Sequence, residues 1–259
     1  MFRASPRDGI VWITGASDGI GRAVALDLAS KGYRIAATAR RQEALAQLAD
    51  EAPGRIFAFP GDVTDRAGMA DIVAAIEAAH GPIALALLNA GVYYQGERGG
   101  FDALTAWRTV ETNLGGVIFC LDPLLARMAE RGRGQIAMVA SLAGYRGIPG
   151  SLAYGASKSA VIHLAEGLKL TYEPEGLTIQ VITPGFVRTA MTSANDYAMP
   201  FMMEVEDAAG RIVEGLAHGG FEITFPKRLA YVLKAACLLP NALFFPLMAR
   251  AARRTKPKR

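Results

Sequence analysis

Residues 10–21 read IVWITGASDGIG. The apolar residues at 10–14 predict a strand, the glycines at 15, 19 and 21 predict a loop, and the pattern over 20–31 predicts a helix. Glycine permits a tight turn and lets the backbone approach a pyrophosphate, which the free N–H groups of a helix N-terminus bind. An ordinary glycine turn is the alternative, but the order of strand, loop and helix favours a dinucleotide site. The loop residues of that site are Gly15, Ser17, Asp18, Gly19, Ile20 and Gly21.

The same alternation of short apolar runs and helical patterns continues along the chain. Further strands are predicted at 34–39, 55–60, 83–88, 135–140, 177–182 and 221–225. Helices are predicted at 43–50, 65–79 and 152–172, with further helical segments that end near residue 131. Strands that are apolar on both faces indicate a parallel sheet covered by helices on both sides. We therefore expect an α/β, Rossmann-like fold, a doubly wound parallel sheet of about seven strands, as one domain over residues 1–225. An apolar C-terminal extension follows it.

The charge of the chain is unevenly placed. The net charge is +4, but the last ten residues contain six basic side chains and no acidic one, so residues 1–249 carry −2. A body of this charge argues against nucleic acid as a partner. With 51% hydrophobic and 20% charged residues, the chain is also too apolar to be disordered. We expect a cytoplasmic protein, because the N-terminal apolar run is too short for a signal peptide.

Neither the cysteines nor the histidines form a metal-ligand pattern. Cys120 and Cys237 are far apart and in apolar surroundings, which predicts two buried or half-buried thiols. The three histidines, His80, His163 and His218, are scattered along the chain. We therefore expect no metal site.

Two arginines follow the second predicted strand. In a dinucleotide site, a carboxylate at this place pairs with the ribose hydroxyls of NAD, whereas Arg40 and Arg41 stand here. A guanidinium group binds phosphate through two parallel hydrogen bonds, so the pair favours NADP(H), with its 2′-phosphate, over NAD(H). The alternative is a solvated pair of charges at the start of a helix.

Tyr154 and Lys158 are four residues apart in the helix predicted over 152–172, and so they share one face of it. A nearby ammonium favours tyrosinate and lowers the pKa of a tyrosine. Tyr154 is therefore a candidate proton donor for carbonyl reduction, or a base for alcohol oxidation. This spacing alone is common by chance, and its weight comes from the other motifs.

Together, the motifs resemble the short-chain dehydrogenase/reductase family in its compact single-domain branch. The resemblance extends over residues 10–225, and its motifs occur in family order: Thr14-Gly15-(x)3-Gly19-Ile20-Gly21, Asp62-Val63, Asn89-Ala90-Gly91, Asn113, Ser141, Tyr154-(x)3-Lys158 and Pro184-Gly185. One position departs from the pattern, since Leu88 stands where the family commonly has Asn. That substitution is conservative at a strand end.

The resemblance implies further cofactor contacts beyond the glycine loop and the two arginines. They fall on Asp62, Val63, Asn89, Ala90, Gly91, Tyr154, Lys158, Pro184, Gly185, Val187 and Thr189. The first two of these would contact the adenine, and the last four would close over the nicotinamide amide.

The catalytic residues implied by the resemblance are Asn113, Ser141, Tyr154 and Lys158. Ser141 would hydrogen-bond the substrate carbonyl, and Lys158 would hold the nicotinamide ribose while it tunes Tyr154. Asn113 would hold a water that connects Lys158 to solvent. The implied reaction is an NADP-dependent hydride transfer between nicotinamide C4 and a carbonyl or secondary alcohol.

The substrate is indicated only by the loops that border the family's site. Candidate substrate contacts are Ser141, Tyr154, Tyr93, Tyr145, Phe186 and Met191. Aromatic and methionine side chains suit an adaptable apolar pocket, which favours an apolar, lipid-like carbonyl over a sugar. Two alternatives stay open: an alcohol-oxidising dehydrogenase acting on a steroid or small secondary alcohol, and a non-catalytic cofactor-binding sensor. The resemblance also implies a homodimer or homotetramer built through the helices near 111–131 and 152–172.

Residues 229–248 read LAYVLKAACLLPNALFFPLM and are the most apolar segment of the chain. Pro240 and Pro246 interrupt the segment and disfavour a membrane-spanning helix. Because six basic residues follow, residues 226–259 fit an interfacial segment on an anionic membrane surface, where the protein would be peripheral. The alternative is an arm packed on its own domain or on a partner subunit.

Overall fold

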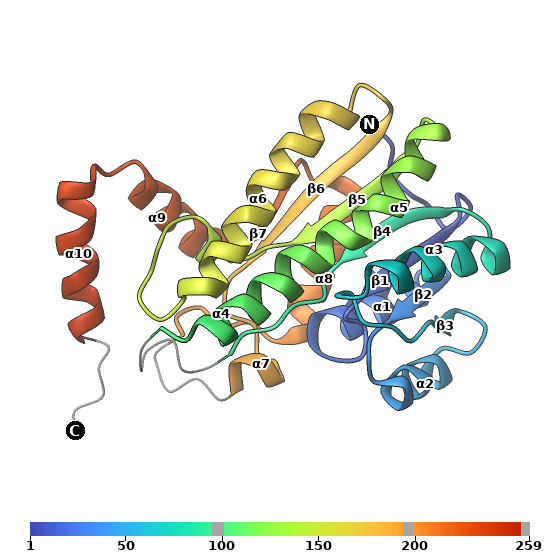
Figure 1. Cartoon of the computed structure of the whole chain (residues 1–259), viewed down its shortest axis with the longest axis horizontal. Helices are drawn as coiled ribbons and strands as arrows, with labels where there is room; N and C mark the ends of the chain where they lie inside the picture. The colour runs from blue at the N-terminus through green and yellow to red at the C-terminus, as the bar shows by residue number, and fades with distance from the viewer. Residues whose placement is uncertain (95–100, 194–198, 255–259) are drawn as a thin grey trace.

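The computed structural model describes residues 1–94, 101–193 and 199–254. Within them, seven strands form one sheet in the order β3-β2-β1-β4-β5-β6-β7, and every neighbouring pair is parallel (Figure 1). The strands are β1 (Ile10–Thr14), β2 (Ile35–Thr38), β3 (Ile56–Ala58), β4 (Ile83–Leu88), β5 (Gly134–Val139), β6 (Leu177–Pro184) and β7 (Glu222–Phe225). The predicted parallel sheet is confirmed.

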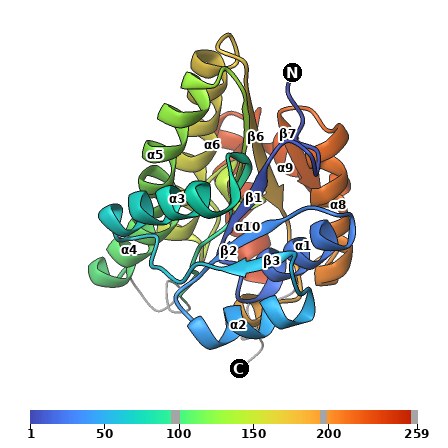
Figure 2. The same ribbon diagram turned by 90° about the vertical axis from the view of Figure 1, so that its right-hand side faces the viewer.

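Helices cover both faces of the sheet, as expected. In the described part of the chain they are α1 (Gly19–Ser30), α2 (Gln42–Glu51), α3 (Arg66–His80), α4 (Ala103–Val110), η1 (Glu111–Gly115), α5 (Gly116–Glu130), η2 (Leu142–Gly144), α6 (Leu152–Tyr172), α7 (Ala190–Ser193), α8 (Val205–His218), α9 (Lys227–Cys237) and α10 (Asn241–Arg254). Figure 2 shows α1, α2 and α8 on one face, and α3, α5 and α6 on the other.

Alternation along β1 produces the two hydrophobic cores. Val11 and Ile13 belong to the core beneath α1 and α8, whereas Ile10 and Trp12 belong to the core beneath α3 and α5. Successive side chains point to opposite faces of a strand, so a strand covered on both sides is apolar throughout. All five residues of β1 are buried.

A π-helical turn, η1, joins α4 to α5 in one continuous helical run. Asp102 begins the run, because its carboxylate accepts a hydrogen bond from the Thr105 N–H at 2.8 Å. A π-turn inserts an extra residue and changes the direction of the side chains on it. Here it contains Asn113, which is buried and bonded to α6. Hydrophobic periodicity predicts helical segments here but does not reveal a turn this short.

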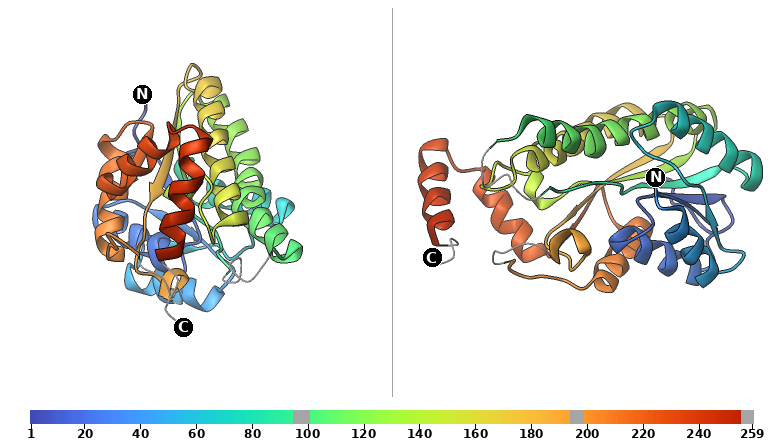
Figure 3. Two further views of the ribbon diagram at one scale, coloured as in Figure 1. Left: turned by 90° about the vertical axis from the view of Figure 1, so that its left-hand side faces the viewer. Right: turned by 60° about the horizontal axis from the view of Figure 1, so that its bottom comes forward.

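The C-terminal extension forms two helices that meet at Pro240. α9 follows β7, and α10 stands at the outer end of the molecule, on the side where the parallel strands end (Figures 1 and 3). Pro246 lies inside α10, so the prediction that it interrupts the segment is wrong. Proline removes one intrahelical hydrogen bond, and α10 continues on both sides of it. None of the described helices is long and apolar enough to cross a membrane.

The two cysteines differ in burial. Cys120 of α5 is buried, as predicted, and burial raises the pKa of its thiol. Cys237 is exposed, which corrects the prediction of a buried or half-buried thiol. It ends α9 at the surface, where its apolar neighbour Leu238 is exposed as well. No group of histidine, cysteine or acidic side chains among the described residues is arranged to hold a metal ion.

Candidate functional site

The glycine loop joins β1 to α1 and is tied to the end of β4. Thr14 Oγ1 accepts hydrogen bonds from the N–H groups of Asn89 (3.0 Å) and Ala90 (3.2 Å). The Asn89 amide donates to the carbonyls of Thr14 (3.1 Å) and Gly15 (3.2 Å). These bonds connect the two strands between which the order of the sheet reverses, the usual ligand site of open α/β sheets.

Close backbone approach requires glycine at two positions of this loop. A Cβ on Gly15 would lie 2.8 Å from Ala90 Cα, and a Cβ on Gly21 would lie 2.5 Å from Asn89 Nδ2. Both positions therefore have no room for a side chain. A bare backbone loop that opens a helix fits the pyrophosphate of a dinucleotide.

The segment after β6 approaches the glycine loop from the opposite side. Asp18 caps α1 by accepting a hydrogen bond from the Gly19 N–H at 2.7 Å, and a Cβ on Gly19 would lie 3.2 Å from Thr189 Cγ2. Ser17 and Ile20 are half-buried beside it. The start of α1 thus faces the segment that the family resemblance assigns to the nicotinamide.

Several hydrogen bonds hold this segment, which follows Pro184, the last residue of β6. The Gly185 N–H donates to the Phe225 carbonyl at 2.7 Å. Val187 is buried and pairs with Met203, whose N–H donates to the Phe186 carbonyl at 3.0 Å. The Thr189 N–H donates to Thr192 Oγ1 at 3.0 Å.

Arg40 and Arg41 lie at the rim of the glycine loop. Arg41 Nη2 lies 3.2 Å from Ser17 Oγ and 3.4 Å from Asp18 Oδ2. Arg40 Nη1 lies 3.9 Å from Asp62 Oδ2. Both guanidinium groups are mostly exposed, so they are available to a phosphate at this rim.

Asp62 and Val63 follow β3 and have different surroundings. Asp62 Oδ1 accepts hydrogen bonds from the Thr64 N–H (3.0 Å) and hydroxyl (2.9 Å), which fixes the turn. Val63 is buried, and a Cβ on Gly116 would lie 2.6 Å from its Cγ2. The pair therefore holds the end of β3 against the start of α5.

Ser141, Tyr154 and Lys158 come together where β5 ends and α6 begins. Ser141 Oγ accepts a hydrogen bond from the Ala143 N–H at 3.1 Å and lies 3.5 Å from the Pro184 carbonyl. Lys158 Nζ lies 5.8 Å from the ring centroid of Tyr154. The backbone of Gly144 packs directly on α6, since a Cβ there would lie 2.7 Å from the Lys158 carbonyl carbon. This packing places the loop of Ser141 against the helix of the other two residues.

Lys158 is buried, with 4% of its surface exposed. Its Nζ donates to the Val139 carbonyl at 2.8 Å. Burial lowers the pKa of this ammonium to about 8, because a charge loses its hydration there. A charge held without water next to a tyrosine ring is typical of a catalytic site.

Asn113 fastens the loop after β4 to α6. Its Oδ1 accepts from the Val92 N–H at 2.7 Å, and its Nδ2 donates to the Val92 carbonyl (3.0 Å) and to Ser157 Oγ (3.1 Å). Gly91 makes room for this contact, because a Cβ there would lie 3.1 Å from Asn113 Oδ1 and 3.3 Å from Lys158 Nζ. Asn113 and Lys158 therefore border the same glycine.

One candidate substrate contact, Tyr93, borders Tyr154. The rings of Tyr93 and Tyr154 meet edge to face, with 5.2 Å between their centroids, and the Tyr93 hydroxyl donates to the Gly150 carbonyl at 3.1 Å. Phe186 is half-buried after β6, and Met191 of α7 is exposed. Residues 95–100 of the loop after β4 lie outside the described residues.

The hydroxyl of Tyr145, another candidate substrate contact, is engaged by the sheet edge. It bonds to the carboxylate of Glu222 and lies 3.1 Å from Thr183 Oγ1. Burial and the Glu222 hydrogen bond raise the pKa of Tyr145. Glu222 also pairs with Lys234 of α9. The group therefore connects the loop after β5, the β7 edge and the C-terminal extension.

Sequence reasoning missed Arg146 and Glu222. Arg146 contacts the C-terminal extension through backbone carbonyls. An arginine in a loop gives no sequence signal of such a contact. Glu222 did give one, because it is an acidic residue inside a predicted apolar strand.

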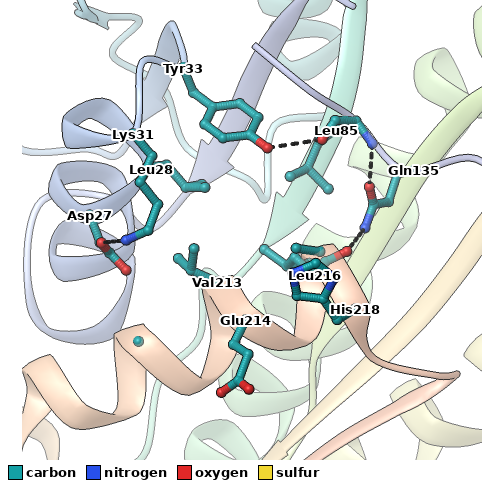
Figure 4. A pocket seen from close by; sticks show the side chains of 13 residues that line it. Asp27, Leu28, Lys31, Tyr33, Leu85, Gln135, Val213, Glu214, Leu216 and His218 are labelled. Atoms are coloured by element: carbon teal, nitrogen blue, oxygen red, sulfur yellow. Dashed lines mark hydrogen bonds and ion pairs between the residues drawn. The ribbon is translucent and has the colours of Figure 1, made fainter.

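A separate pocket of about 350 Å³ lies between α1 and α8, at the amino ends of the strands (Figure 4). Several of the polar groups around it bond to the protein. Asp27 pairs with Lys31, and the Tyr33 hydroxyl donates to the Ala4 carbonyl at 3.0 Å. It contains none of the predicted site residues, which gather at the carboxyl ends.

Comparisons with known proteins agree with this geometry. The family model described as short chain dehydrogenase matches residues 9–200. An uncharacterised oxidoreductase of Myxococcus xanthus is 36% identical over 94% of this chain and 96% of its own. Acetoacetyl-CoA reductase of Rhizobium meliloti is 31% identical over 71% of this chain and 76% of its own. Among solved structures, an actinorhodin polyketide ketoreductase variant with NADPH has a TM-score of 0.78 and 25% identity, covering 88% of this chain and 99% of its own.

Proposed function

Because the chain belongs to the short-chain dehydrogenase/reductase family and is an NAD(P)-dependent oxidoreductase acting on CH–OH groups, we propose that it transfers a hydride between NADP(H) and an apolar, lipid-like carbonyl or alcohol. The observation that carries the proposal is buried Lys158 beside the ring of Tyr154, on the helix against which the loop of Ser141 packs. A scaffold without turnover has no need to bury a lysine next to that tyrosine, since an unpaired buried charge is costly.

The nicotinamide, when bound, supplies or accepts the hydride. In the reductive direction, the Tyr154 hydroxyl donates a proton to the substrate oxygen as negative charge develops there. Ser141 Oγ donates a hydrogen bond to the same oxygen and stabilises that charge. The Lys158 ammonium favours the tyrosinate that remains. The reverse order of these steps oxidises an alcohol.

Asn113 acts in this proposal as a positioning residue as well as the neighbour of a relay water. Its side-chain amide is bonded to Val92 and Ser157, so it holds the loop after β4 against α6. The water predicted to connect Lys158 to solvent stays a prediction. Proton supply through Asn113 is a part of the mechanism that a proton-exchange measurement would test.

The preference for NADP(H) over NAD(H) is supported by Arg40 and Arg41. Their guanidinium groups lie at the rim of the glycine loop, and the nearest acid to each, Asp62 and Asp18, is also exposed. A 2′-phosphate would offer these cations a doubly charged partner. The solved ketoreductase to which this chain is similar is with NADPH.

The substrate class is supported by side chains and by relatives' names. The ring of Tyr93 packs against that of Tyr154, and Phe186 and Met191 are further apolar candidates in the segment after β6. The named relatives include an acetoacetyl-CoA reductase and ketoacyl reductases. The alcohol-oxidising alternative is favoured by a different relative, a gluconate 5-dehydrogenase. The side chains and the names of the reductase relatives both support the reduction of an acyl-type ketone.

A panel assay tests the proposal. Purified protein is given NADPH and ketones of increasing chain length, including acetoacetyl and longer β-ketoacyl thioesters, and absorbance at the nicotinamide band is followed. We expect turnover that rises with apolar length and is lower with NADH. NADPH binding without turnover on any ketone or alcohol would instead favour the sensor alternative.

Two partners complete the proposal. A second copy is supported by large apolar side chains exposed on α4, α5 and α6, namely Leu104, Trp107, Ile118 and Leu170, because monomers seldom expose many such residues together. Light scattering would return a dimer or tetramer mass. The other partner is an anionic membrane surface, contacted through residues 226–259.

A further inference from the structure

Arg146 fixes the C-terminal helices to the loop after β5. Its Nη1 donates to the carbonyls of Ala236 (2.6 Å) and Leu239 (2.8 Å), and its Nη2 donates to Asn241 Oδ1 (2.7 Å). The guanidinium carbon lies 3.6 Å from the ring centroid of Phe244, which is buried. The turn between α9 and α10 therefore has a defined position relative to the body.

The outer side of these two helices is apolar and uncovered. Large apolar side chains that are more than half exposed are Tyr231, Val232, Leu238, Leu243, Phe245 and Leu247. Leu238, in the turn between the helices, is 86% exposed. Of the α10 side chains that the structure describes, Phe244 alone is buried. A helix with apolar residues on several sides is normally covered.

A basic residue shares this outer side. Leu243, Leu247 and Arg250 occupy positions i, i+4 and i+7 of α10, so they lie on one face, and all three are exposed. Residues 226–259 contain nine lysines and arginines and no acidic residue, whereas residues 1–225 carry a net charge of −5.

We infer that the docking face, formed by Leu238, Leu243, Leu247 and Arg250, seats on an anionic lipid surface. Its apolar side chains enter the headgroup boundary, and Arg250 contacts lipid phosphates. Arg146 holds the face beside the loop that carries Ser141, so docking turns this end of the molecule toward the lipid. The inference rests on the membrane-surface part of the proposed function and names the residues that perform it.

Charge favours lipid over a second copy of the chain on this face. A two-fold contact places the same patch of both copies together, and here it would bring the exposed Arg250 of each copy into one contact. An anionic bilayer offers the opposite charge over its whole area, and it accepts apolar side chains from several sides of a helix.

The test is sedimentation of the full chain with vesicles of phosphatidylcholine alone or with one quarter phosphatidylglycerol. One variant, Leu243→Ser/Leu247→Ser, removes apolar contact. A second, Arg250→Glu/Arg253→Glu/Arg254→Glu, reverses charge. The matched control, Arg7→Glu/Arg133→Glu/Arg211→Glu, makes the same change of net charge at cations exposed elsewhere on the body. NADPH binding is measured on every preparation.

We expect the wild type and the control to sediment with the mixed vesicles, both docking variants to bind at least tenfold more weakly, and NADPH binding to be equal in all four. Equal sedimentation of all four, or no sedimentation of the wild type, would overturn the inference while retained NADPH binding leaves the proposed enzyme intact. A docking variant that changes the mass in light scattering, with no lipid binding by the wild type, would assign the face to a second copy instead.

Discussion

The Lys158 ammonium donates its hydrogen bond to the Val139 carbonyl, with 2.8 Å between the two atoms. This bond joins α6 to the last residue of β5, two residues before Ser141. It holds a cation in a place from which water is excluded. The cost of that charge is visible in its pKa, which burial lowers to about 8 from an ordinary value of 10.5.

The stability of the cofactor-free protein should therefore depend on Lys158 above pH 8. Between pH 8 and 10.5 the unfolded chain binds a proton at this lysine that the folded chain has lost, so the free energy of unfolding rises with pH. Relative to that of Lys158→Met, the free energy of unfolding of the wild type should rise by about 3 kcal/mol between pH 8 and 10.5. Denaturant melts of both proteins at several pH values would measure it. A constant difference between them would show that Lys158 is not perturbed in the folded state.

Arg41 should decide the choice of cofactor. Arg41→Ala removes a phosphate partner, so the Kd for NADPH should rise about 10- to 100-fold, while the Kd for NADH stays unchanged. Fluorescence titration of both cofactors measures the ratio. Arg22→Ala is the control, because Arg22 of α1 pairs with Glu51 away from the loop. An equal loss for both cofactors would mean that Arg41 supports the loop and does not read the phosphate.

Gly21 should tolerate no side chain. Alanine there would press against Asn89 and the Gly15 carbonyl, which should cost about 1–3 kcal/mol of unfolding free energy and weaken dinucleotide binding. Gly167→Ala is the matched control, because nothing lies near its Cβ position in α6 and alanine favours the helix by about 0.5–1 kcal/mol. Thermal melts of the two variants should move in opposite directions.

Arg146 should hold the C-terminal helices in place. Arg146→Ala removes four hydrogen bonds and uncovers Phe244, so amide exchange in 236–248 should become at least tenfold faster. Exchange in β1 and β4 should be unchanged, because those strands lie in the centre of the sheet. Mass spectrometry of exchanged peptides reads both regions at once. Unchanged protection of 236–248 would show that other contacts fix α10.

The inner strands were predictable because they are buried on both faces and are therefore mainly apolar. Trp12 and Ile13 show why: one packs beneath α3 and the other beneath α1. The Gly15, Gly19 and Gly21 spacing was predictable for a related reason. Close contacts exclude a side chain at Gly15 and Gly21, and a positive φ disfavours one at Gly19. Sequence patterns were sufficient for prediction wherever the local backbone geometry determined the residue type.

Contacts between distant segments were not predictable. Arg146 donates hydrogen bonds mainly to backbone carbonyls some 90 residues later. Every residue has a backbone carbonyl, so the sequence does not indicate which of them accepts. Pro246 was expected to interrupt the apolar segment, but α10 continues on both sides of it. Cys237 was expected to be covered by apolar neighbours that turn out to be exposed themselves. Each of these incorrect or missing predictions depends on which surfaces of α9 and α10 pack against the rest of the protein.

Tyr154→Phe tests the central claim most directly. The measurement is NADPH oxidation with the ketone that the wild type reduces fastest, together with the Kd for NADPH. Tyr172→Phe, the same change at the far end of α6, is the control and should behave as the wild type. For Tyr154→Phe we predict an unchanged Kd and a turnover lower by about 10²- to 10⁴-fold, since the proton donor is gone. Turnover within tenfold of the wild type would contradict the assignment of Tyr154 and the mechanism built on it.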